Sequence, residues 1–174
     1  WEIDSPESKK FRGSIIFAGP LLARFGKAKI PLPGGCVLGK RPISSHIDVL
    51  TECGIAFEYQ NGSAIFRVEK PVKKVRVWQL EASVTATENF AMYAAGSTGS
   101  YELIDAACEP HVTEVLVLLQ NMGAKISGIG TNRILIEGRK DLKRAVFVPG
   151  QDPIDIVGYI VAAALTKGKI TIKD

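Results

Sequence analysis

The hydrophobic residues of this chain follow two different patterns. Residues 14–25, 83–95 and 154–165 are apolar on nearly every face when drawn as helices, which is typical of helices that are buried all round. Residues 169–173 (KITIK) instead alternate polar and apolar side chains, as a strand does when only one face of its sheet is covered. Together the two patterns predict helices on the inside and sheets on the outside.

Shorter elements lie between these helices. A second helix is predicted over residues 46–53. Two strands, 55–59 and 64–68, are separated by Asn61-Gly62, a dipeptide that favours a tight β-hairpin turn.

The chain repeats itself at an offset of about 69 residues. The offset places Gly54 on Gly123 and Leu50 on Leu119, and similar matches continue along the sequence. Each copy is predicted as strand, helix, strand, helix, strand, strand (βαβαββ). The third copy is expected to begin with a strand at residues 145–147 and to stop after a second strand. The sequence therefore predicts an α/β (α+β) fold of about two and a half repeated units.

Composition narrows the class of protein. With 174 residues, 46% of them hydrophobic, the chain is long enough for one substantial core, and no apolar run is long enough to span a membrane. The net charge of +4 suits acidic ligands such as phosphates. Nucleic acid is not expected as a partner, because the basic run at residues 70–76 has no interleaved aromatic residues and resembles a solvated linker.

The cysteines and histidines show no metal-binding spacing. Cys36, Cys53 and Cys108 form no CxxC pair, and His46 and His111 form no ligand pattern with them, so neither a metal site nor a disulfide framework is expected. This cysteine usage fits a reducing cytoplasm. Outside the loop described next, Cys53 and Cys108 are predicted to be packing residues and His111 a surface residue.

One loop combines glycines, a thiol and cations. It runs from Pro33 to Pro42, with Cys36 directly after a Gly-Gly pair and Lys40-Arg41 close behind. Glycines let a backbone approach a ligand closely, and neighbouring cations favour the reactive thiolate form of a cysteine. The loop therefore suits a small anion and a reactive thiol, although a glycine-rich turn with an incidental cysteine explains these residues equally well.

Several motifs along the chain form a specific set. They are FRGS (11–14), GPLLARFG (19–26), PGGC (33–36), GKRP (39–42), ASVTAT (82–87), LxxMGAKISG (119–128) and RILIEG (133–138). Through these motifs, over nearly its whole length, the chain resembles the UDP-N-acetylglucosamine 1-carboxyvinyltransferases, a family of enolpyruvyl transferases.

The resemblance implies a fold and a domain organisation. Members of that family have an inside-out α/β barrel with two domains of three repeated units each, and the active site lies between the domains. Residues 1–150 would then form most of the domain that carries the catalytic loop. Residues 151–174 would start the next unit in the second domain, and the rest of that domain would be a missing partner of this chain.

The resemblance also implies a reaction. It transfers the enolpyruvyl group of phosphoenolpyruvate to the 3′-hydroxyl of UDP-N-acetylglucosamine and releases phosphate, which is the first committed step of peptidoglycan synthesis in the cytoplasm. No cofactor or metal is implied. The 174-residue chain alone is expected to be inactive, since part of the active site would lie in the missing domain.

Individual residues match functional positions of the family. Cys36 matches the cysteine that protonates the vinyl CH2, can add covalently to phosphoenolpyruvate, and is alkylated by fosfomycin. Arg41 matches the arginine that grips phosphoenolpyruvate, and Arg12 matches a position that binds the sugar nucleotide. The other expected substrate-binding residues are Pro42, Ile43, Ser44, Ser45, Glu81, Ala82, Ser83 and Val84.

Some positions depart from the family pattern. Ser44 replaces a usual aspartate, Glu81 stands where many members carry lysine, and residues 152–158 differ from the family's helix start. His46 matches a family histidine near the loop, where a structural and a catalytic role are both open. Two alternatives remain: an enzyme similar to 3-phosphoshikimate 1-carboxyvinyltransferase, against which the Gly-Gly-Cys loop argues, and a non-catalytic remnant that binds a nucleotide sugar.

Overall fold

Two sheets of similar connectivity form the outside of the molecule. In a computed structural model, which describes residues 1–32 and 42–173, the first sheet contains, in spatial order, β1 (Lys27–Pro31), β3 (Ser63–Val68) and β2 (Ile55–Gln60). The second contains β4 (Lys74–Trp78), β5 (Gly99–Ile104), β7 (Arg133–Gly138) and β6 (Lys125–Ser127). The order β1-β3-β2 corresponds to β5-β7-β6, with antiparallel pairing throughout both sets. This correspondence confirms the predicted repeat.

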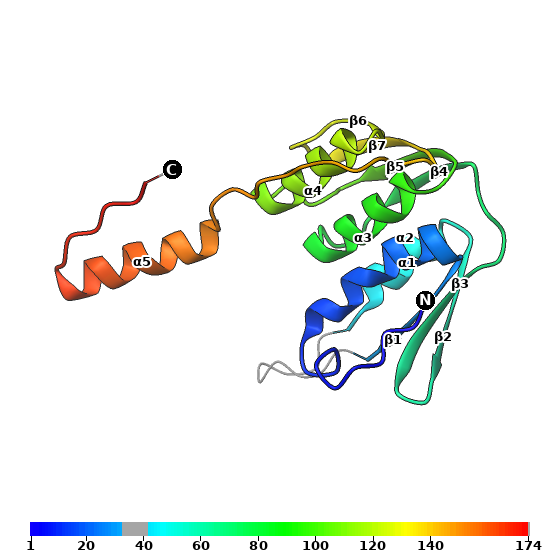
Figure 1. The fold of residues 1–174 in the computed structure, drawn as a ribbon, viewed down its shortest axis with the longest axis horizontal. Helices are drawn as coiled ribbons and strands as arrows, with labels where there is room; N and C mark the ends of the chain where they lie inside the picture. The colour runs from blue at the N-terminus through cyan, green and yellow to red at the C-terminus, as the bar shows by residue number, and fades with distance from the viewer. Residues whose placement is uncertain (33–41, 174) are drawn as a thin grey trace.

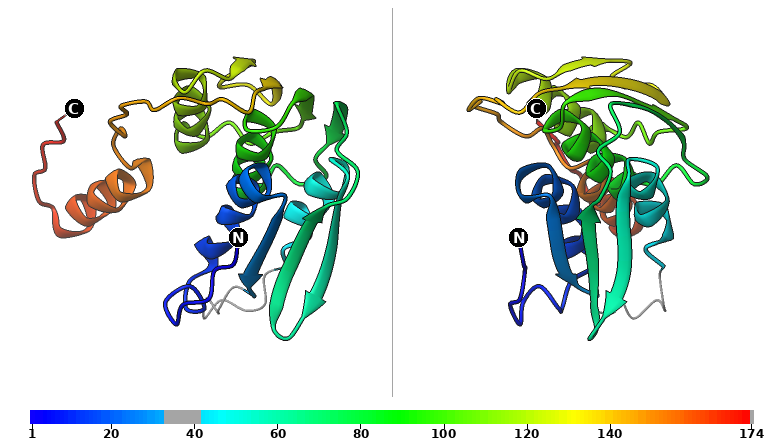
Figure 2. Two further views of the ribbon diagram at one scale, coloured as in Figure 1. Left: turned by 45° about the vertical axis from the view of Figure 1, so that its right-hand side comes forward. Right: turned by 90° about the vertical axis from the view of Figure 1, so that its right-hand side faces the viewer.

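The helices other than α5 lie between the sheets, and α5 lies apart from them (Figures 1 and 2). The helices are η1 (Arg12–Phe17), a 3-10 helix, followed by α1 (Ala18–Phe25), α2 (Ser44–Thr51), α3 (Val84–Ala95), α4 (Pro110–Asn121) and α5 (Pro153–Thr166). α3 is the central helix, because it packs against η1, α1, α2 and α4. Its residues from Ala86 to Phe90 are all buried. The second unit therefore has the predicted βαβαββ order, from β4 through α3, β5, α4 and β6 to β7.

The strands place apolar residues inward and charges outward. In β4, Val75 and Val77 are buried and alternate with exposed neighbours. On the outer face, Glu102 of β5 is paired with Arg76 of β4 and Arg133 of β7, the latter donating through Nε at 2.7 Å. The predicted arrangement of buried helices and outward-facing sheets is thus confirmed for the two described units.

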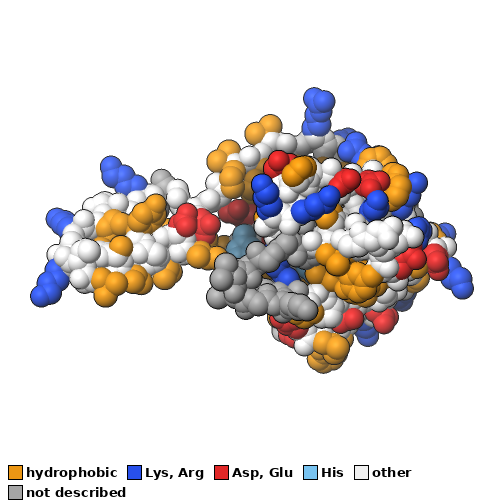
Figure 3. Space-filling model, turned by 90° about the horizontal axis from the view of Figure 1, so that it is seen from below, with side chains coloured by type: hydrophobic (Ala, Val, Ile, Leu, Met, Phe, Trp, Pro, Cys, Tyr) orange, Lys and Arg blue, Asp and Glu red, His pale blue; other side chains and the backbone are white. Residues whose placement is uncertain are grey.

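The prediction for the third unit is only partly correct. The helix appears as α5, but residues 145–147 and 169–172 are not strands. No α5 residue is buried, and Leu165 is 81% exposed. Figure 3 shows hydrophobic side chains along the lobe that α5 forms at the left. A strand needs a paired neighbour and an apolar helix needs a covering layer, and no part of the described chain supplies either here.

Two smaller predictions also have clear outcomes. Cys53 is fully buried and its Sγ lies 3.3 Å from the carbonyl oxygen of Val49, which confirms a packing role. Cys108 is exposed in the segment before α4, so the prediction that it packs in the core is wrong. Ala106 and Ala107 in the same segment are buried, whereas the chain turns the side chain of Cys108 outward. None of the described helices is both long enough and apolar enough to cross a bilayer.

Candidate functional site

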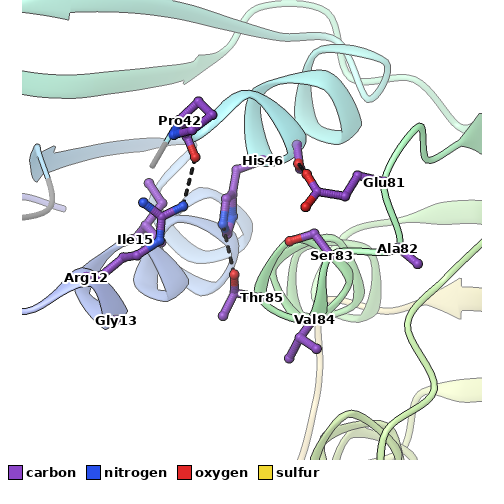
Figure 4. A pocket seen from close by; sticks show the side chains of 11 residues that line it. Arg12, Gly13, Ile15, Pro42, His46, Glu81, Ala82, Ser83, Val84 and Thr85 are labelled. Carbon is purple, nitrogen blue, oxygen red and sulfur yellow. Dashed lines mark hydrogen bonds between the residues drawn. The ribbon is translucent and has the colours of Figure 1, made fainter. Parts of the chain in front are cut away.

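A cavity of about 530 Å³ opens where three segments meet, and we call it the η1–α2–α3 pocket (Figure 4). η1 forms one wall, the start of α2 a second, and the segment that leads into α3 a third. Its lining residues are Arg12, Gly13, Ile15, Pro42, Ser45, His46, Glu81, Ala82, Ser83, Val84 and Thr85. This volume is within the range of small-molecule binding sites.

The pocket brings together most of the predicted binding residues that the structure describes. Those in its wall are Arg12, Pro42, Ser45, Glu81, Ala82, Ser83 and Val84. Ile43 is instead buried in the core, and Ser44 is exposed at the first position of α2 without lining the pocket. Cys36 and Arg41 lie outside the described residues.

Arg12 connects two walls of the pocket. Its Nη2 atom donates a hydrogen bond of 2.8 Å to the carbonyl oxygen of Pro42, 30 positions later in the chain (Figure 4). Arg12 is half-buried, so its guanidinium is partly shielded from water. A cation at this position favours an anionic group in the pocket.

The N-terminus of α3 adds further hydrogen-bond donors. The N-cap residue, Ser83, makes no side-chain capping hydrogen bond. The amide groups in the first turn of a helix have no acceptor within the helix, and the helix dipole makes this end positive. Because Val84 and Thr85 line the pocket, the site combines a helix N-terminus with the Arg12 cation, a combination that suits an oxygen anion.

Hydrogen bonds fix the segment that leads into α3. Gln79 is buried, and its Nε2 donates to the carbonyl oxygens of Glu81 and Ser83 at 2.5 and 3.1 Å. Gln79 Oε1 in turn accepts a hydrogen bond of 3.1 Å from Thr87 Oγ1 on α3. The segment is therefore held against α3 by the chain's own polar groups.

Glu81 places a negative charge in the same wall. Ser45 Oγ donates a hydrogen bond of 2.8 Å to Glu81 Oε2, which connects the start of α2 to this segment. The exposed carboxylate opposes an anionic ligand, in contrast to Arg12 and the α3 N-terminus. The pocket is therefore electrostatically mixed rather than uniformly positive.

His46 lines the pocket but is almost fully buried, and both of its ring nitrogens contact polar groups. Nδ1 is 2.9 Å from Asn89 Nδ2, and Nε2 is 3.1 Å from Thr85 Oγ1. Burial, with a smaller contribution from the charge of Arg12, lowers the pKa of His46 from 6.5 to about 4. His46 is therefore neutral near pH 7.

Sequence reasoning missed two members of this network. Thr85 directly follows residues 81–84, which were predicted to bind substrate. Its position in the first turn of α3 is the feature that could have identified it as a further binding residue. Asn89 contacts residues more than 40 positions away, and no local sequence pattern reports such contacts. Within the described ranges, no group of three or more His, Cys, Asp or Glu side chains could hold a metal ion.

The fold has clear counterparts among solved structures. An enolpyruvyl transferase from Streptomyces tendae, NikO, superimposes with a TM-score of 0.63 over 82% of this chain and 34% of its own, at 22% sequence identity. The chain therefore has the enolpyruvyl transferase fold, with helices inside and sheets outside. A profile of the EPSP synthase (3-phosphoshikimate 1-carboxyvinyltransferase) family matches residues 2–174. The chain belongs to this family.

Curated relatives are more similar in sequence. The chain is 42% identical over 166 residues to a UDP-N-acetylglucosamine 1-carboxyvinyltransferase of Vesicomyosocius okutanii, covering 95% of this chain and 39% of the relative. It is 44% identical over 165 residues to the protein of the same name from Treponema denticola, covering 95% and 38%. The chain thus spans about two fifths of the length of the curated relatives it matches.

Proposed function

We propose that this chain is the nucleotide-sugar-binding part of an enzyme that transfers the enolpyruvyl group of phosphoenolpyruvate to the 3′-hydroxyl of UDP-N-acetylglucosamine. The main support is the η1–α2–α3 pocket, in which Arg12, Ser45 and residues 81–84 meet although they are distant in sequence. The names of the curated relatives support the choice of acceptor. The cellular context would be peptidoglycan synthesis in the cytoplasm.

The pocket has suitable groups for a nucleotide sugar. Arg12 and the first turn of α3 would bind diphosphate oxygens, since both present donors and positive charge. The Ser45–Glu81 pair would accept hydrogen bonds from hydroxyl or N–H groups of the ligand. Glu81 replaces the lysine that many members carry, so the balance between these contacts would differ from theirs.

The chemistry would proceed by addition and elimination. The 3′-hydroxyl oxygen bonds to C2 of phosphoenolpyruvate, its proton goes to a base, and the vinyl CH2 takes a proton from an acid. Phosphate then leaves C2 with the electrons of the broken C–O bond, and the new methyl group loses a proton to restore the double bond. In this scheme Cys36 is the acid, and Arg41 holds phosphoenolpyruvate.

The second half of the active site would come from the remainder of the protein. Residues 1–150 would form most of one domain, and residues 151–174 would begin the next unit. The exposed apolar side chains of α5, including Ile154 and Leu165, support this division because such a helix needs a covering layer. The general base and further phosphate-binding cations would lie in that second domain.

Phosphate release is the direct test. The whole protein that contains these residues should release phosphate from phosphoenolpyruvate with UDP-N-acetylglucosamine, and should not do so with shikimate 3-phosphate. Cys36→Ala should abolish release while the exposed-thiol control Cys108→Ala should retain it. The 174-residue chain alone should be inactive. Release with shikimate 3-phosphate only would favour the alternative enzyme, and no release with either acceptor would favour a binding remnant.

A further inference from the structure

The orientation of the Asn89 side-chain amide is determined by two backbone partners. Its Oδ1 accepts a hydrogen bond of 2.7 Å from the amide of Gly19, and its Nδ2 donates one of 2.8 Å to the carbonyl oxygen of Ile15. Exchanging oxygen and nitrogen would place a donor against a donor and an acceptor against an acceptor. The second Nδ2 proton therefore points at His46 Nδ1, 2.9 Å away.

This orientation determines which His46 nitrogen carries the proton. Because Nδ1 faces a donor, it must be the unprotonated acceptor, and in a neutral imidazole the proton is then on Nε2. Nε2–H therefore donates to Thr85 Oγ1 at 3.1 Å. His46 and Asn89 are almost fully buried, with exposed fractions of 2% and 0%, so water does not compete for these bonds.

The hydroxyl proton of Thr85 is left to point elsewhere. Its oxygen accepts from His46, and within residues 1–32 and 42–173 it donates to no protein acceptor. Thr85 is half-buried and lines the η1–α2–α3 pocket, at the first turn of α3 (Figure 4). A hydroxyl held in this way is a hydrogen-bond donor directed at the ligand space.

We propose that the Thr85 hydroxyl donates a hydrogen bond to an acceptor oxygen of the nucleotide sugar, with His46 and Asn89 as its positioning residues. The proposal deepens, and depends on, the proposed function. Thr85 extends the donor set formed by Arg12 and the α3 N-terminus, so an anionic or carbonyl oxygen is the matching chemical class. The role of His46 is then to accept one hydrogen bond from Asn89 and to donate one to Thr85.

Calorimetric titration of the full chain with UDP-N-acetylglucosamine tests the contact. Thr85→Ser keeps the hydroxyl and should bind within about twofold of the parent chain. Thr85→Val keeps the shape but removes the donor, and should bind about three- to tenfold more weakly. Because Thr85→Val also leaves His46 Nε2–H without its acceptor, thermal melting should accompany each titration so that affinity is compared between folded proteins.

The tautomer gives a second measurement that needs no variant. With only two histidines, His46 and His111, the nitrogen-15 spectrum of the imidazoles is readily assigned. His46 should be the neutral Nε2–H form near pH 7 in the free chain. A proton on Nδ1, or equal affinity of the Ser and Val variants, would overturn the proposal.

The Thr85 contact and the proposed function can be contradicted separately. If the Ser and Val variants bind equally while the whole protein turns over UDP-N-acetylglucosamine, only the Thr85 contact is wrong. If the chain binds no UDP-N-acetylglucosamine, the contact is overturned, and phosphate release by the whole protein then decides the proposed function independently.

Discussion

Gly19 donates its backbone N–H to the side-chain oxygen of Asn89 at 2.7 Å, where α1 crosses α3. The two helices are so close that a Cβ at residue 19 would lie 2.3 Å from the Asn89 backbone oxygen. The same Asn89 side chain orients His46. One close helix contact therefore supports the hydrogen bonds behind the η1–α2–α3 pocket.

Gly19→Ala should destabilise the chain by about 3 kcal/mol, because the added methyl group must displace backbone rather than a flexible side chain. Urea unfolding followed by circular dichroism measures the change. Gly158→Ala is the matched control, since nothing lies within 4 Å of a Cβ there and α5 has no buried residue. Its midpoint should not fall, because alanine favours a helix interior over glycine, and a Gly19→Ala midpoint equal to that of the control would contradict the close contact.

Stability should fall at acidic pH through His46. Its pKa is lowered from 6.5 to about 4 in the folded chain, so between these values the unfolded chain binds a proton that the folded chain does not. The free energy of unfolding should therefore be highest above about pH 6.5 and decline as the pH falls toward 4, by about 3 kcal/mol in all.

Two variants separate His46 from other titrating groups. His46→Gln should reduce the decline between about pH 6.5 and pH 4, because glutamine does not titrate. His111→Gln is the matched control for the removal of a histidine side chain. Urea midpoints measured across this range would contradict the account if both variants followed the parent chain.

Glu81 should weaken the binding of phosphate-bearing ligands. Glu81→Gln keeps an oxygen that can accept from Ser45 Oγ but removes the negative charge, so the affinity for UDP-N-acetylglucosamine should rise about two- to fivefold at low salt. The gain should shrink as salt is added. Glu52→Gln at the other end of α2 is the control and should have no effect. Calorimetry that shows unchanged or weaker binding for Glu81→Gln would be inconsistent with a diphosphate beside Glu81.

Fosfomycin should distinguish the three cysteines. After incubation of the whole protein with fosfomycin and UDP-N-acetylglucosamine, mass spectrometry should find the label on Cys36. Cys53 should stay unmodified, because burial, aided by the charge of Glu52, raises its thiol pKa to about 12 and leaves almost no thiolate. Cys108 is exposed and reports indiscriminate alkylation. An unmodified Cys36 in active protein would exclude it as the proposed acid.

Hydrophobic periodicity and short sequence motifs correctly predicted several elements of the fold. The 69-residue offset, the Asn61-Gly62 hairpin and the buried face of α3 all follow from short-range patterns, and the structure contains each of them. Apolar character alone failed for α5 and for residues 145–147 and 169–172. Apolar side chains indicate which surfaces must be buried, but they do not show whether the residues that bury them belong to the same stretch of chain.

Part of the η1–α2–α3 pocket was predicted from the family resemblance and not from hydrophobic periodicity. Arg12, Ser45 and Glu81 match substrate-binding positions of the resembled family, whereas the roles of Thr85 and Asn89 depend on contacts made only after folding. The direction of the Thr85 hydroxyl depends on two backbone groups, at Gly19 and Ile15, that are about 70 positions from Asn89. A local sequence pattern cannot report the direction of the Thr85 hydroxyl, because that direction depends on residues so far apart in the chain.

Amide chemical shifts of the full chain during titration with UDP-N-acetylglucosamine show whether the η1–α2–α3 pocket binds the nucleotide sugar. The largest saturable changes should occur at Arg12, Ser45 and residues 83–85. Changes confined to the separate groove between the start of α4 and residues 150–154, or no change at all, would contradict it.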